Sequence, residues 1–191
     1  MAVRDIVLYP HPILKQKCAE ADWNEAEIQQ LCQDLLDTLE HCPGVGVAAP
    51  QIGSALRVFA VNVNKEPNNG LLVLINPEMI SHEGHVTGRE GCLSIPEFTA
   101  NVARYERIQM RALNPQGQEV LINSSGFEAI CLQHELDHLD GVLFLDRVAC
   151  LKNDVFKRKG GQPRYSLEEM ARLLQANTPV QTVVPNPGGL A

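Results

Sequence analysis

The segment His134-Glu135-Leu136-Asp137-His138 contains two histidines and a glutamate at a spacing that suits metal chemistry. Residues four apart share one face of a helix, so both imidazoles can bind the same ion. Glu135 lies beside them, within reach of a water molecule on that ion, as a general base requires. The pattern therefore indicates a metal centre that activates water, but it does not select one reaction.

A catalytic centre of this kind needs a third protein ligand and one open coordination position. One metallopeptidase class extends the pattern to H-E-x-x-H-x-x-G-x-x-H, and here Gly141 matches the glycine but Phe144 replaces the last histidine. Another class uses a later glutamate, yet Glu168 and Glu169 lie in a separate predicted helix after a glycine-rich break. Both patterns are disfavoured, which leaves a cysteine as the candidate third ligand.

Six cysteines could supply that thiolate. Cys131 is nearest in sequence, but an ion between His134 and His138 lies about 7.5 Å further along the helix axis. A sulfur reaches only ~3 Å from its own Cα and a metal–sulfur bond adds ~2.3 Å, so Cys131 is expected to line the pocket instead. Cys92 follows a glycine and could approach closely on a tight backbone. Spacing alone does not select it over the remaining cysteines, which are Cys18, Cys32, Cys42 and Cys150.

Three helices are predicted from apolar spacing and end signals. Asn24 and Glu27 resemble a capping box before an apolar stripe over residues 28–39, and this helix must end near His41 because Pro43 follows. Ser124 and Ser125 could cap a second helix that continues to about residue 139 and carries the histidines. A capping box of Ser166 and Glu169 begins a third helix, which runs to about residue 176.

Strands are predicted over residues 56–63, 71–75 and 102–112, and a turn at Gln116-Gly117 leads into another over 119–122. Regular βαβ alternation is missing from this order, so we expect an α+β fold with small antiparallel or mixed sheets packed around the central H-E-x-x-H helix. Residues 1–176 should form a single catalytic domain. Residues 177–191, rich in proline and glycine, should form a flexible tail.

Composition and charge bound the class of protein. The chain has 23 acidic and 16 basic residues, a net charge of −7, which disfavours specific nucleic-acid binding. The amino-terminal residues carry no apolar stretch of signal-peptide length, and no apolar run approaches the ~20 residues that cross a bilayer. We therefore expect a cytoplasmic protein without membrane contact, whose cysteines are reduced thiols.

Three segments together resemble the peptide deformylase family, and the resemblance extends from about residue 3 to residue 150. It implies that Cys92, His134 and His138 hold the metal, that Glu135 is the acid and base, and that Gln51 with the Leu93 backbone N–H binds the developing oxyanion. The segments are Gly44-Val45-Gly46-Val47-Ala48-Ala49-Pro50-Gln51, Glu90-Gly91-Cys92-Leu93-Ser94 and Gln133-His134-Glu135-Leu136-Asp137-His138.

The resemblance also implies the substrate, which is the N-formylmethionine end of a newly made polypeptide. Gly46 should let the peptide main chain approach closely and pair like a strand. An ion pair of Glu90 with Arg104 should hold the loop of the metal cysteine, so Arg104→Ala should weaken metal retention. The remaining residues expected to line the substrate pocket are Val45, Phe127, Ile130 and Cys131.

One divalent metal ion per chain is expected. A Cys/His/His set suits zinc or ferrous iron; the resemblance favours Fe(II), with Ni(II) or Co(II) as substitutes. We expect a monomer. The family allows a transient ribosome contact, although the carboxyl-terminal part departs from the basic helix of some bacterial members: after Lys152, Lys157, Arg158 and Lys159 it continues with a helix containing two glutamates.

Two other functions compete with this interpretation. A zinc endopeptidase would also use H-E-x-x-H, but it would cleave an internal peptide bond without releasing formate. A non-catalytic binder of formyl peptides or metal could share the fold. Binding alone requires neither Glu135 nor Gln51, and their presence therefore favours an enzyme.

Overall fold

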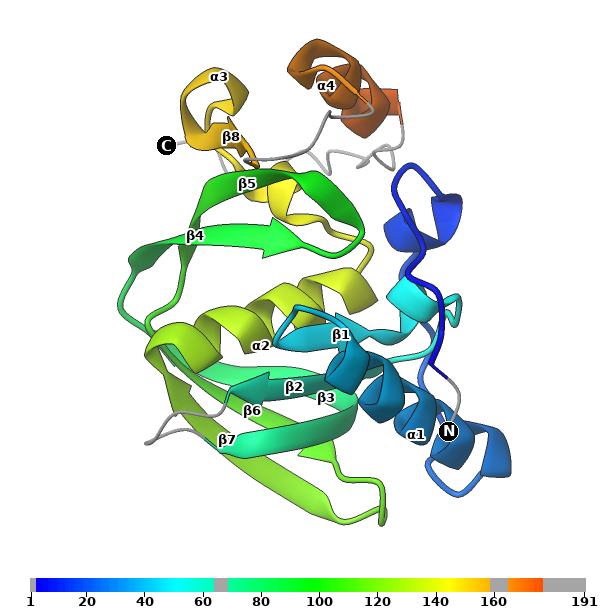
Figure 1. Cartoon of the computed structure of the whole chain (residues 1–191). Coiled ribbons are helices and arrows are strands. Elements are labelled where there is room, and N and C mark those ends of the chain that lie inside the picture. Colours follow the sequence, from blue (N-terminus) through cyan, green and yellow to red (C-terminus); the bar gives the residue numbers. More distant parts are fainter. Residues whose placement is uncertain (1–2, 64–68, 159–164, 177–191) are drawn as a thin grey trace, which may run out of the picture.

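The computed structural model describes residues 3–63, 69–158 and 165–176. Two antiparallel sheets lie on opposite sides of helix α2 (Gly126–Leu139), and helix α1 (Ala26–His41) lies beside the larger sheet (Figure 1). This arrangement confirms the expected α+β fold around a central helix. The short helical elements are η1 (Pro12–Lys15), η2 (Ala49–Ile52), η3 (Phe144–Arg147), α3 (Leu151–Asp154) and α4 (Leu167–Ala176).

The larger sheet has the order β1-β2-β3-β6-β7, and every neighbouring pair is antiparallel. Side chains alternate between its faces, as strand geometry requires. Phe59 and Val61 pack with Leu132 of α2, whereas Val58 and Ala60 pack with α1. Both faces of β2 are therefore covered by helices. The bounds are β1 (Gly46–Ala48), β2 (Val58–Val63), β3 (Gly70–Glu83), β6 (Arg107–Leu113) and β7 (Glu119–Ser125).

The smaller sheet has the order β4-β5-β8, with β4 (Val86–Cys92), β5 (Ile95–Arg104) and β8 (Val155–Lys157). One face of β5 is buried through Phe98, Ala100 and Val102, which pack with residues from η3 and α4. β4 is an edge strand of this sheet, as β1 is of the other. The two edges flank the region in front of α2.

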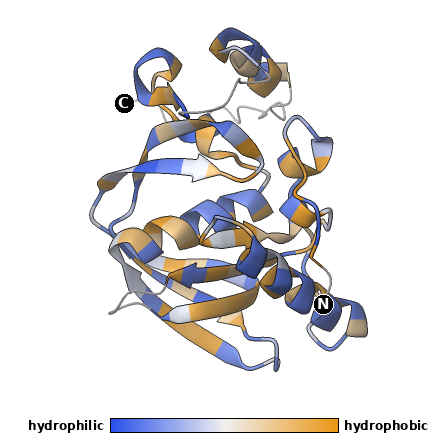
Figure 2. Cartoon of the chain, in the orientation of Figure 1, coloured by the Kyte–Doolittle hydropathy of each residue, from blue (hydrophilic) through white to orange (hydrophobic). Residues whose placement is uncertain are grey.

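Helix α2 carries both apolar and hydrophilic residues (Figure 2). Its apolar side packs on the larger sheet through Ala129, Leu132 and Leu139. Its polar residues are also buried, and they include Gln133, His134, Glu135, Asp137 and His138. Buried polar groups need partners, because an unpaired one costs free energy. Those partners form the candidate site. In the part of the chain that the structure describes, no helix is long and apolar enough to cross a membrane.

Several expectations about the helices are tested by these contacts. The capping box of Ser166 and Glu169 is confirmed, with Glu169 N–H donating to Ser166 Oγ at 3.1 Å and Ser166 N–H to Glu169 Oε2 at 2.7 Å. The box at Asn24 is wrong: α1 begins at Ala26 without a side-chain cap. The Asn24 N–H donates instead to Asp22 Oδ1, so the local turn forms ahead of the helix.

The strand predictions were right in type and wrong in extent. The run over 102–112 belongs to two strands in different sheets, β5 and β6, because the chain turns at Tyr105 and Glu106. β3 continues to Glu83, well beyond residue 75. β4 was missed, since its glycines and charges have low strand propensity and its conformation depends on pairing with β5. The expected tail over 177–191 lies outside the described residues.

Candidate metal centre

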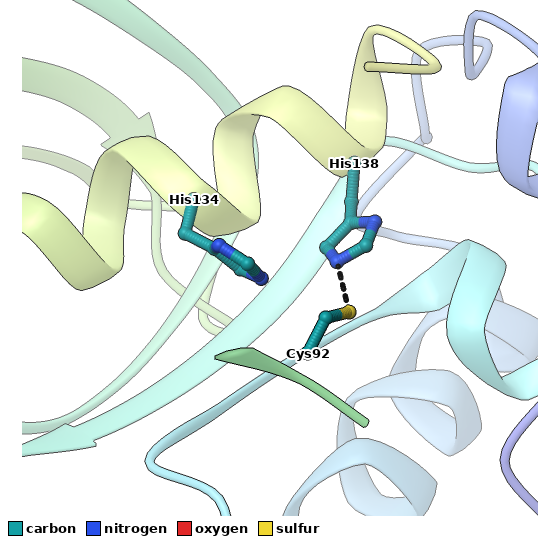
Figure 3. A group of neighbouring side chains, drawn as sticks. All are labelled: Cys92, His134 and His138. Carbon is teal, nitrogen blue, oxygen red and sulfur yellow. Dashed lines mark hydrogen bonds between the residues drawn. The ribbon is translucent and has the colours of Figure 1, made fainter. Parts of the chain in front are cut away.

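Three side chains converge between α2 and the end of β4 (Figure 3). Cys92, His134 and His138 each offer one ligand atom, and these atoms all lie within 4.8 Å of one another. Cys92 Sγ is 3.3 Å from His138 Nε2. The two histidines come from successive turns of one helix, whereas the cysteine comes from an edge strand of the smaller sheet.

His134 is oriented by a buried carboxylate. Its Nδ1 lies 2.8 Å from Glu90 Oε2, which leaves Nε2 as the nitrogen that could bind a metal ion. Arg104 in turn holds Glu90 through two bonds, Nε to Oε1 at 2.7 Å and Nη2 to Oε2 at 2.9 Å. The ion pair that the sequence suggested is therefore present. Burial raises the pKa of Glu90, but Arg104 and His134 outweigh burial and lower it to about 2.

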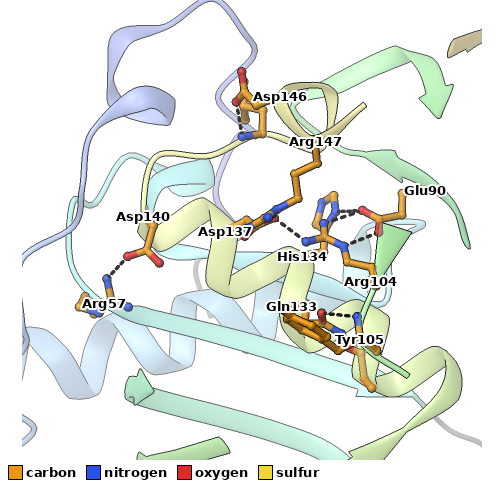
Figure 4. A network of polar contacts seen from close by, with 12 residues as sticks. Arg57, Glu90, Arg104, Tyr105, Gln133, His134, Asp137, Asp140, Asp146 and Arg147 are labelled. Carbon is orange, nitrogen blue, oxygen red and sulfur yellow. Dashed lines mark hydrogen bonds and ion pairs between the residues drawn. The ribbon is translucent and has the colours of Figure 1, made fainter. Parts of the chain in front are cut away.

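The network continues to residues that sequence reasoning did not identify as functional (Figure 4). Arg104 Nη1 donates to Asp137 Oδ2 at 2.6 Å, and Arg147 of η3 binds both oxygens of the same carboxylate. Arg104 is almost fully buried, with 2% of its side chain exposed. Asp137 occupies a position of the H-E-x-x-H pattern at which the pattern specifies no residue. Its partners come from β5 and η3 and could not be found from local spacing.

The Cys92 thiol lies in an environment that favours its anion. Burial raises its pKa, but the charges and hydrogen bonds of His138 and His134 outweigh burial and hold the pKa well below its ordinary value. A thiolate is the form that binds metal ions. By contrast, burial raises the pKa of the Cys131 thiol to about 12. Cys131 lines the neighbouring cavity and is not part of the three-ligand group.

Glu135 directs its carboxylate into the same space. Its Oε2 is buried without a hydrogen-bond partner among the described residues. Burial raises the pKa of Glu135 to about 7, against the lowering effect of His134 and His138. Gly46 on β1 makes room for this side chain, because a Cβ there would lie 2.8 Å from Glu135 Cδ. The glycine is therefore needed for the position of the glutamate as well as for close approach from the cavity side.

Gln51 is fixed in one orientation by its neighbours. Its Oε1 accepts from the Ala48 N–H at 2.9 Å, so the NH₂ group points the other way, toward Cys92 Sγ at 3.4 Å and Ser94 Oγ at 3.2 Å. The side chain is 1% exposed. A donor held this firmly beside the candidate metal ligands needs no reorganisation to bind a developing negative charge. Ser94 was not among the sequence-predicted site residues.

A cavity of about 260 Å³ opens in front of these groups. All the expected pocket residues line it, with Val45 and Phe127 at its exposed mouth and Ile130 and Cys131 further in. Glu90 also lines it, but both its oxygens are engaged by Arg104 and His134. Leu93 lies on the same wall as Cys92. The cavity has further lining from Arg89 and Arg158, which sequence reasoning did not assign to the site.

The residues present fit a divalent metal ion. The donor set consists of one thiolate and two imidazoles, a combination that binds zinc or ferrous iron. His134 has the carboxylate partner typical of metal-binding histidines. The buried, partnerless oxygen of Glu135 is also suited to a water molecule held beside such an ion.

Comparison with known proteins places this geometry in a family. The family model described as polypeptide deformylase matches residues 3–154. A peptide deformylase of Aquifex aeolicus is 42% identical over 176 residues, covering 91% of this chain and 98% of the relative. One from Syntrophobacter fumaroxidans is 41% identical over 160 residues, covering 83% and 94%.

Solved structures agree with these relatives. The crystal structure of a peptide deformylase from Legionella pneumophila has a TM-score of 0.75 and 35% identity, covering 93% of this chain and all of that one. The enzyme from Ehrlichia chaffeensis in complex with actinonin has a TM-score of 0.75 and 34% identity, covering 80% and 92%. With its metal-ligand geometry and its match along most of its length, the chain belongs to the polypeptide deformylase family, whose members are metal-dependent hydrolases that remove the N-formyl group from new polypeptides.

Proposed function

We propose that Cys92, His134 and His138 hold one catalytic metal ion in this chain and that Glu135 and Gln51 carry out the hydrolysis of the formyl group. The observation that supports this most is the convergence of the three ligand atoms beside a buried carboxylate oxygen that has no partner among the described residues. When bound, the ion lowers the pKa of water and so supplies a nucleophile near neutral pH.

Glu135 acts as the proton carrier in this proposal. Its carboxylate accepts a proton from the attacking water and later delivers that proton to the leaving amine. The side chain is 4% exposed, and Gly46 leaves the space in which it lies. The amine departs as the free amino end of methionine, and the formyl carbon leaves as formate.

Gln51 and the Leu93 backbone N–H stabilise the negative oxygen that develops on the formyl carbon. The Gln51 amide is already oriented by the Ala48 N–H, so its NH₂ group faces the site before substrate arrives. A donor of this kind typically contributes about 10²–10³ in rate. Hydrolysis thus depends on one residue from η2, one from the turn directly after β4 and one from α2.

The peptide is proposed to bind in an extended form between the two edge strands. In the described part of the chain, β1 and β4 each have an edge that pairs with no other strand, and residues of both line the cavity. An extended chain can add to such an edge through main-chain hydrogen bonds. The methionine side chain then points toward α2, where Phe127, Ile130 and Cys131 supply apolar contacts.

Fe(II) is the metal we propose, with zinc, nickel and cobalt able to replace it. The thiolate and imidazole ligands suit each of these ions. The test is anaerobic purification followed by metal analysis and a formate-release assay with a formyl-Met tripeptide. Activity that is lost in air, removed by a chelator and restored by Ni(II) or Co(II) supports the proposal. Cleavage of an internal peptide bond without formate would instead indicate an endopeptidase.

The cellular setting is also part of the proposal. We infer a cytoplasmic monomer whose catalytic domain spans residues 1–176 and acts on N-formylmethionyl nascent peptides. All six cysteines are unpaired, in keeping with a reducing compartment. Lys152 and Lys157 are exposed and could make a transient contact with the ribosome. Co-sedimentation with ribosomes that Lys152→Glu and Lys157→Glu together abolish would support that contact.

A further inference from the structure

Two arginines lie at the opening of the cavity, Arg89 on β4 and Arg158 directly after β8. Both side chains are exposed, and both residues line the cavity that contains Cys92. Arg158 reaches this position because Gly91 has no side chain: a Cβ there would lie 2.6 Å from Arg158 Nη2. The strand register of β8 with β5, and of β5 with β4, brings the two arginines to the same side of the smaller sheet.

Arg89 is held in place by neutral groups. Its Nε donates to Asn101 Oδ1 at 3.1 Å and its Nη1 to Thr99 Oγ1 at 3.2 Å. Its guanidinium also lies 3.5 Å from the centroid of the Phe156 ring. These contacts fix the position of the cation, but none of them cancels its charge.

Neither guanidinium forms an ion pair with a carboxylate of the described residues. Glu90, the nearest acid along β4, is engaged by Arg104 and His134. Among the described residues, six other arginines do have a carboxylate partner, in keeping with the chain's net charge of −7. They are Arg4, Arg57, Arg104, Arg107, Arg111 and Arg147. Two cations at the cavity opening, neither paired with a carboxylate of the described residues, indicate that the ligand brings the negative charge.

Strand geometry indicates which part of the ligand meets these arginines. Along β4, Glu90 and Cys92 are buried toward α2, whereas Arg89 and Gly91 belong to the opposite face. Side chains of an extended peptide on the β4 edge alternate in the same way. If methionine points toward α2, as the proposed function requires, the residue after methionine points toward Arg89 and Arg158.

We propose that Arg89 and Arg158 make this enzyme selective for formyl-Met peptides with a carboxylate on the residue directly after methionine. This specificity rests on the proposed function and adds a substrate class to it. Contacts between exposed charges are weak individually, so two arginines together should give a preference of about 3- to 10-fold in kcat/KM. The preference should shrink between 0.1 M and 1 M salt, because the Debye length falls from about 10 Å to about 3 Å.

The test compares amidated peptides that differ at one position. We expect formyl-Met-Glu-Ala-amide to exceed formyl-Met-Gln-Ala-amide in kcat/KM, and formyl-Met-Lys-Ala-amide to be the poorest. The gain in kcat/KM from a glutamate should be smaller in formyl-Met-Ala-Glu-amide, because its side-chain carboxylate lies on the face of the extended peptide away from the arginines. Formyl-Met-Ala is compared as the free acid and as the amide. A higher kcat/KM for the free acid alone, without a difference between the Glu and Gln peptides, would mean that the α-carboxylate and not a side-chain carboxylate is recognised. Equal kcat/KM for the Glu and Gln peptides would overturn the proposal.

Variants then locate the effect. The ratio of kcat/KM for the Glu peptide to that for the Gln peptide should fall toward one in the double variant Arg89→Gln/Arg158→Gln. The same ratio should persist in the single variant Arg158→Lys. Lys17→Gln removes the same charge from an exposed position outside the cavity and should leave the ratio unchanged. An equal drop in Lys17→Gln would assign the preference to net charge and overturn the role of the arginines. If the parent protein itself released no formate from any of these peptides, the neutral ones included, that result would instead contradict the proposed function.

Discussion

Replacement of Arg104 by alanine should destabilise the protein and weaken its hold on the metal. Arg104 binds Glu90 with two bonds and Asp137 with a third, and only 2% of its side chain is exposed. Its loss leaves Glu90 with His134 alone, while Asp137 keeps Arg147. Removing one partner of a buried ion pair typically costs about 3–5 kcal/mol.

The magnitude follows from the size of the chain. For domains of about 150–250 residues, 1 kcal/mol corresponds to about 2–4 °C in Tm. Arg104→Ala should therefore lower Tm by roughly 6–20 °C. Loss of support for a metal ligand typically costs about 10- to 100-fold in metal affinity. The expected metal effect arises because Glu90 no longer has a fixed position from which to orient His134.

Thermal unfolding and metal competition with a chelator measure the two effects separately. Arg107→Ala is the matched control, since it removes an arginine three residues away that is 52% exposed and pairs with exposed Glu83. That change should leave Tm and metal retention close to those of the parent. Arg104→Lys should be intermediate, because lysine keeps the charge but lacks the planar fork that binds Glu90 through two nitrogens.

A double variant separates stability from orientation. Arg104→Met with Glu90→Gln removes both charges of the pair, so much of the lost stability should return. Metal affinity should stay low, because His134 then lacks a carboxylate partner. The reasoning would be refuted by an Arg104→Ala protein with parental Tm and parental metal retention. Recovery of metal affinity in the double variant would refute the orienting role of Glu90.

Three further substitutions test the chemistry of the site. Glu135→Gln should retain the metal and lower formate release by about 10²–10⁴-fold, whereas parental turnover with full metal content would exclude Glu135 as the proton carrier. Gln51→Ala should lower kcat/KM by about 10²–10³-fold, measured with a formyl-Met tripeptide; a change confined to KM would mean that Gln51 binds substrate without stabilising the oxyanion. Gly46→Ala should lower kcat while the protein still folds, because its Cβ would displace Glu135, which lies within 2.9 Å; unchanged kcat would show that the glutamate tolerates the shift.

The histidine pair and Glu135 could be predicted from sequence because they are local. Helical spacing alone places residues 134 and 138 on one face, and α2 holds them there. The thiolate was different. Spacing excluded Cys131 but left five cysteines, and the choice of Cys92 came only from the resemblance. Its position depends on β4, a strand whose glycines and charges gave no strand signal.

The Glu90–Arg104 pair was predicted from the sequence, but its connection to Asp137 and Arg147 was not. Glu90, Arg104 and Arg147 come from β4, β5 and η3, and only tertiary packing brings them to α2. The run over 102–112 even concealed the position of Arg104, which ends β5 just before the chain crosses to the other sheet. From the sequence alone, a charged residue such as Arg104 in a run of alternating residues is expected on the exposed face of a strand. Its burial follows only from the packing of both sheets.

The placement of the ligands on different elements links metal binding to folding. Two imidazoles are fixed by one helix, but the thiolate joins them only when the smaller sheet lies beside α2, as in Figure 1. The Arg104 network joins the same two parts, since Glu90 lies on β4 and Asp137 on α2. A bound ion should therefore stabilise the packing of the smaller sheet as well as activate water. Among the described strands the edge of β4 stays unpaired, so under the proposed function the strand that supplies the sulfur can also pair with the substrate.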